Sequence, residues 1–93
     1  MTKEEQREAE VQAVIDGFAE KGYLALYGGR KGHGFWIYRT TPEQVAVYYA
    51  VDGWCEIPGE IIQNNGRNSG NPYFWMMADA VKLLAALREK PCQ

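Results

Sequence analysis

A glycine-rich loop holds the residues whose types best suit binding chemistry. Residues 28–34 place Arg30, Lys31 and His33 among four glycines. Glycine loses the most backbone entropy on ordering, so this run favours a loop between two strands. Its backbone N–H groups can form an anion-binding concavity, and its cations can bind phosphate or carboxylate. We therefore take all three side chains as candidate partner-binding residues, the alternative being a hairpin tip whose charges serve only solubility.

A second candidate lies in the polar run 63–71, which reads Q-N-N-G-R-N-S-G-N. Its density of turn-forming residues predicts a loop. Arg67 stands there among amide donors and acceptors, a set suited to recognising a polar edge. The same loop can equally be a plain connector.

Neither a metal site nor a nucleophilic pair is indicated by the remaining reactive residues. His33 is the sole histidine, and Cys55 and Cys92 are far apart in the sequence, so no zinc pattern exists. No spacing supports a Cys55–His33 pair. We therefore expect no cofactor, no metal and no catalytic activity, and two free thiols in a reducing compartment.

Length and composition fit one domain spanning residues 1–93. The chain is 46% hydrophobic and 24% charged with a net charge of −2, which is typical of a globular protein. It has no apolar stretch near the ~20 residues that span a membrane, and its acidic start is unlike a signal peptide. We expect a cytoplasmic protein without membrane contact, of the kind that phages or mobile elements encode. The basic residues are too few for a dedicated nucleic-acid binder.

The first element is a helix from about residue 2 to residue 21. Thr2 and Glu5 form a T-x-x-E capping box, and Gly22 suits the position after the helix end. One face is apolar and the opposite face is polar. The apolar stripe consists of Val11, Val14, Ile15 and Phe18, and the polar stripe of Glu4, Glu8, Gln12, Asp16 and Glu20.

The middle of the chain is β-prone. Strands are expected over residues 23–27, 35–39, 45–51 and 54–57, the last two joined by an Asp52-Gly53 turn. Thr41 and Pro42 also resemble a helix start, which leaves residues 42–52 as strand or helix, with alternation favouring the strand. A second helix is expected over residues 72–89 after an Asn71 cap.

The elements predict an α+β fold. Their order is α-β-β-β-(β)-α, with an antiparallel sheet of three or four strands packed against flanking helices. Strand alternation then predicts an aliphatic core face and a second face of aromatic rings separated by alanines. The core face would hold Leu24, Leu26, Phe35, Ile37, Val45, Val47, Tyr49 and Val51, and the aromatic face Tyr23, Ala25, Tyr27, Trp36, Tyr38, Ala46, Tyr48 and Ala50.

An aromatic face needs a ligand or a cover, and the wide apolar arc of the second helix, or residues 58–71, could supply the cover. The first hypothesis is a non-enzymatic protein that occupies a protein partner as a small adaptor or inhibitor. The second hypothesis is a nucleic-acid-binding module that stacks bases on Tyr23, Trp36, Tyr38 and Tyr48. The third is a protein that binds planar small molecules in an aromatic pocket or at a homodimer interface. The candidate contact residues are Arg30, Lys31, His33, Trp36, Tyr38, Tyr48 and Arg67.

Overall fold

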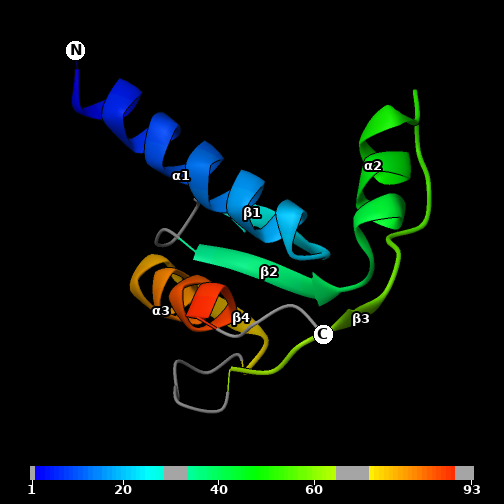
Figure 1. The fold of residues 1–93 in the computed structure, drawn as a ribbon. Coiled ribbons are helices and arrows are strands. Elements are labelled where there is room, and N and C mark those ends of the chain that lie inside the picture. Colours follow the sequence, from blue (N-terminus) through cyan, green and yellow to red (C-terminus); the bar gives the residue numbers. More distant parts are fainter. Residues whose placement is uncertain (1, 29–33, 65–71, 90–93) are drawn as a thin grey trace.

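The computed structural model describes residues 2–28, 34–64 and 72–89. This part of the chain contains three helices and a four-stranded antiparallel sheet. The expected α+β class is confirmed. No helix within these ranges is long and apolar enough to cross a membrane. The elements, shown in Figure 1, are α1 (Lys3–Glu20), β1 (Tyr23–Gly28), β2 (Gly34–Arg39), α2 (Pro42–Ala50), β3 (Glu60–Ile61), β4 (Phe74–Met76) and α3 (Met77–Glu89).

Helix α1 follows the sequence prediction closely. The Thr2 hydroxyl accepts a hydrogen bond from the Glu5 backbone at 3.1 Å, and the Glu5 carboxylate accepts one from the Thr2 backbone at 2.9 Å, which completes the capping box. Gly22, with φ +85°, follows the Lys21 C-cap. The predicted apolar stripe is buried at Val11, Val14 and Phe18, and the polar stripe is exposed.

Strand β2 is the centre of the sheet. It pairs with β1 along its whole length, from Tyr23 opposite Arg39 to Gly28 opposite Gly34. Its other edge is shared, because β3 pairs with its end and β4 with its beginning.

The main core lies between the sheet and the two longer helices. Phe18 of α1 and Phe35 and Ile37 of β2 have no exposed surface, and Ala80 and Leu84 of α3 complete the cluster. Helices α1 and α3 also contact each other where Gly17 meets Leu84. A Cβ at residue 17 would lie 2.7 Å from a Leu84 methyl group, so glycine permits this close approach.

Residues 45–51 are not a strand. Helix α2 occupies Pro42–Ala50, so the alternative helix start is the one the chain uses. The Thr41 hydroxyl accepts from the Gln44 backbone at 3.1 Å and Pro42 lies in the first turn, while β3 and β4 already occupy the free edge of β2. Local helix capping thus outweighs the β propensity of this run.

Two other boundaries differ from the prediction. Residues 54–57 form an extended connection rather than a strand. The last helix starts at Met77, not near residue 72, because residues 74–76 pair with β2 and place Trp75 beside the core. The Trp75 indole donates to the Ile62 carbonyl at 3.2 Å, which stabilises this arrangement.

The strand register also changes the two faces of the sheet. Residues directly opposite each other in an antiparallel pair share a face. Ala25 lies opposite Ile37, and Leu24 opposite Tyr38, so the predicted grouping of Leu24 and Leu26 with Phe35 and Ile37 is wrong. The helix-covered face holds Tyr23, Ala25, Tyr27, Phe35, Ile37 and Trp75, and the aromatic face holds Leu24, Leu26, Trp36, Tyr38, Ile61 and Phe74.

Candidate protein-interaction surface

Four of the predicted contact residues lie outside the described part of the chain. These are Arg30, Lys31 and His33 of the glycine loop and Arg67 of the asparagine-rich loop. Their assignment as partner-binding residues therefore stays a prediction, and so does the expectation of a free thiol at Cys92.

Trp36 and Tyr38 do share the aromatic face, as predicted, and both are half-buried. The Trp36 ring packs edge-on against Phe74 with 5.0 Å between the ring centroids. The Phe74 ring in turn lies over Gly34, where a Cβ would come within 2.6 Å of it. Much of the ring surface on this face is thus used in packing within the sheet.

The predicted four-ring stacking platform does not exist, because two of its members lie elsewhere. Tyr23 belongs to the helix-covered face and packs against Phe18, with 6.1 Å between the ring centroids. Tyr48 belongs to α2 and contacts its neighbour Tyr49 edge-on at 5.6 Å. Of the two expected covers, α3 packs on the opposite side of the sheet with Ala80 and Leu84, and residues 65–71 of the other lie outside the described ranges. The register and the helical state of residues 42–50 account for these differences.

The most accessible apolar surface lies instead on a projecting unit, which we name the α2 arm: helix α2 together with residues 51–59. The chain turns at Asp52 and Gly53, where Gly53 has φ +110°, and then runs back beside α2 toward β3 (Figure 1). Only Val45 of the arm is buried, at 3% exposure, and it anchors the arm to the domain. The rest of the arm adds little to the core.

Five of the nine exposed large hydrophobic side chains among the described residues belong to the α2 arm. Trp54 stands out, with 89% of its surface exposed. Large exposed apolar side chains that cluster in one region of a small protein mark interaction sites. The five are Val47, Tyr49, Val51, Trp54 and Ile57.

A shallow groove separates α2 from the returning segment. Its volume is about 100 Å³, well below the roughly 300–1,000 Å³ of pockets that hold cofactors or metabolites. A groove of this size suits an apolar side chain of a partner. Its walls are Gln44, Val47, Tyr48 and Val51 on α2 and Cys55, Glu56 and Pro58 opposite. Cys55 is a free thiol, half-buried in one wall.

Tyr49 is half-exposed and does not line the groove. Burial raises the pKa of its phenol above the ordinary value of 10.0, and the nearby Tyr48 and Asp16 raise it further. The phenol is therefore neutral at physiological pH and presents a ring with a hydrogen-bonding edge.

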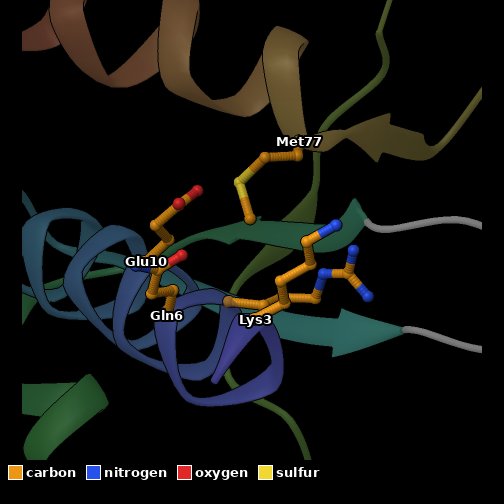
Figure 2. A pocket seen from close by; sticks show the side chains of 5 residues that line it. Lys3, Gln6, Glu10 and Met77 are labelled. Atoms are coloured by element: carbon orange, nitrogen blue, oxygen red, sulfur yellow. The ribbon is translucent and has the colours of Figure 1, made fainter. Parts of the chain in front are cut away.

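A larger hollow of about 370 Å³ lies between the beginning of α1 and the beginning of α3. Figure 2 shows Lys3, Gln6 and Glu10 extending from α1 toward Met77. The polar side chains that line it, including Arg7, are exposed, so none of them is desolvated or held in a fixed geometry. In the described ranges no group of three or more His, Cys, Asp or Glu residues is placed to hold a metal ion.

The α2 arm was missed at the sequence level because its apolar residues were assigned to two buried strands. The informative signal was the Thr41-Pro42 helix start. In a helix from residue 42, positions 44, 47, 48 and 51 share one stripe. No protein family matches this chain, and no curated protein or solved structure is significantly similar to it.

Proposed function

We propose that this protein is a non-enzymatic binding protein that acts by occupying a partner protein through the α2 arm. The single observation that carries the proposal is the exposure of Trp54, at 89%, within a cluster of apolar side chains. Tryptophan is the residue type most enriched among interface residues whose loss costs the most binding energy. The arrangement supports a small adaptor or inhibitor of the cytoplasm, where Cys55 stays a free thiol.

The shape of the arm supports a protein partner over a small ligand. The groove is short, and the exposed side chains on both sides of it extend the contact area well beyond its volume. Protein interfaces have this form, with an apolar centre and a polar rim, whereas small molecules are bound in deep concave pockets.

The test is a comparison of partner capture from a lysate of the source cells, with and without nuclease, followed by binding measurements on the purified pair. We expect Trp54→Ala to weaken binding by about 10- to 30-fold and Val47→Ser to weaken it less, with nuclease having no effect. Val81→Ser is the matched control, since Val81 of α3 is an exposed helical valine at 47% against 55% for Val47. Equal binding by wild type and Trp54→Ala would overturn the proposal.

A further inference from the structure

The charged side chains of the α2 arm itself all have one sign. Between Arg39 and Arg67 the sequence contains no lysine or arginine, and its charged residues are Glu43, Asp52, Glu56 and Glu60. All four carboxylates are on exposed residues. The arm therefore combines an apolar surface with an acidic rim.

Three of the four carboxylates of the acidic rim have no cationic partner among the described residues. Glu60, at the base of the arm, pairs with Arg39 at 3.9 Å. No lysine or arginine of the described ranges lies within 4.0 Å of the carboxylates of Glu43, Asp52 or Glu56. Glu56 lies in the groove wall itself, and the other two groups lie elsewhere on the same arm, Glu43 in the first turn of α2 and Asp52 at the turn of the arm.

The sign of this rim selects among partners. The phosphates of a nucleic acid would be repelled, and a second copy of the same arm would bring two acidic rims together. An acidic protein surface is excluded for the same reason. Lys and Arg side chains would be attracted, and their long alkyl stems can pack beside apolar residues such as Val51 and Trp54.

We infer that the partner presents a basic amphipathic segment, with apolar side chains that enter the groove and contact Trp54, and with Lys or Arg residues that meet Glu43, Asp52 and Glu56. This inference depends on the proposed function and names the class of partner. Grooves bounded by a helix commonly bind amphipathic helices through apolar anchors at three- and four-residue spacing. Opposite charges around the anchor raise the association rate and fix the orientation.

The probes are three synthetic helical peptides of about five turns each. The first has leucine on one face and lysine on the other, the second has the same leucines with glutamate, and the third keeps the lysines and replaces leucine by serine. Binding of each fluorescently labelled peptide to the full chain is measured by anisotropy at low salt and at about 0.5 M salt. We expect the Leu/Lys peptide to bind at least about tenfold more tightly than either of the others at low salt, and to lose much of that advantage at high salt.

Two pairs of variants assign the binding to the arm. Asp52→Asn/Glu56→Gln should weaken the Leu/Lys peptide about threefold to tenfold, whereas the control Glu4→Gln/Glu8→Gln removes two exposed charges from α1 and should change it less than about twofold. Trp54→Ala should weaken the Leu/Lys peptide at both salt concentrations, and Val81→Ser should not.

The outcomes separate the two claims. Three outcomes would overturn the inference about charge. The Leu/Glu peptide could bind as tightly as the Leu/Lys peptide, no peptide could bind, or the two double charge variants could have equal effects on binding. The capture experiment with Trp54→Ala decides the proposed function independently, because it uses whatever partner the cell supplies.

Discussion

Gly34 lies where β2 passes closest to β4 and to the ring of Phe74. A Cβ at this position would come within 2.6 Å of Phe74 and closer still to the Trp75 carbonyl. Because the carbonyl belongs to a paired strand, it cannot move without breaking the pairing of β2 with β4. We expect Gly34→Ala to cost about 2–3 kcal/mol of unfolding free energy, measured by urea denaturation.

Gly28 provides the control for that substitution. It pairs with Gly34, but a Cβ there would meet the Trp36 indole nitrogen at 3.3 Å, a side-chain contact that can adjust. Gly28→Ala should therefore cost less than about 1 kcal/mol. Equal costs at the two glycines would show that the close approach of β4 to β2 is not as described.

Tyr49 gives the domain a specific response to alkaline pH. Its pKa is raised above 10.0 in the folded state, first by burial and then by Tyr48 and Asp16. The unfolded chain therefore loses this proton at a lower pH than the folded chain does. The contribution to stability is fully present below pH 10 and is lost as the pH rises through the raised value.

The measurement is urea unfolding at about pH 8 and about pH 11 for the wild type and for Tyr49→Phe. The variant should lose less stability between the two pH values, because it lacks the phenol whose pKa the fold raises. An equal loss of stability in the wild type and in Tyr49→Phe would exclude Tyr49 as the source of the pH dependence.

Helix α2 depends on its first turn, because so little of it is buried. The Thr41 hydroxyl accepts from the Gln44 backbone at 3.1 Å, and the helix has nine residues with only Val45 buried. Thr41→Ala should lower the free energy of unfolding by about 1 kcal/mol and weaken partner binding through the arm. Thr41→Ser preserves the cap and should restore both properties, which calorimetry and the binding assay would detect.

The sequence predicted the elements whose local and tertiary signals agree. In α1 the capping box, the apolar stripe and Gly22 all coincide, and the β1–β2 hairpin has strands on both sides of a glycine-rich loop. Residues 45–51 were placed in a strand because valine and tyrosine favour strands, a preference that a helix cap can outweigh. Residues 74–76 were placed in a helix because their strand character comes from pairing with β2, a contact between residues about forty positions apart.

The candidate site was less predictable than the fold. Trp36 and Tyr38 were placed on a common face correctly, since they are two residues apart in one strand. Which residues of β1 share that face depends on the hairpin register, and a shift of one residue exchanges the two faces. The exposure of Trp54 required knowing that residues 54–57 pair with no strand, which only the tertiary structure shows.

At the scale of the whole molecule, the described residues divide into a body with a buried core and an arm with one buried side chain. The side chains with no exposure lie on α1, β1, β2 and α3, whereas α2 buries only Val45. We expect the amides of Phe35 and Ile37 to exchange with solvent only on global unfolding, and those of Val47–Ala50 to exchange by local opening at least about tenfold faster. Hydrogen exchange followed by NMR gives both rates.

Binding of a partner to the arm should reduce the difference in amide exchange rate between α2 and the core, because contacts on both sides of the groove would stabilise α2. An unbound protein in which all these amides exchange at one rate would instead show that arm and core unfold as a single unit.

Cys55 gives the groove a natural chemical reporter. The thiol is free, half-exposed and set in the wall opposite Val47 and Val51. A partner side chain that fills the groove must shield it, so its alkylation by a small maleimide should slow in proportion to occupancy. Mass spectrometry distinguishes the peptide that contains Cys55 from the peptide that contains Cys92. The extent of Cys55 alkylation in a crude extract therefore reports the fraction of wild-type protein that is bound to a partner, with no added label or substitution.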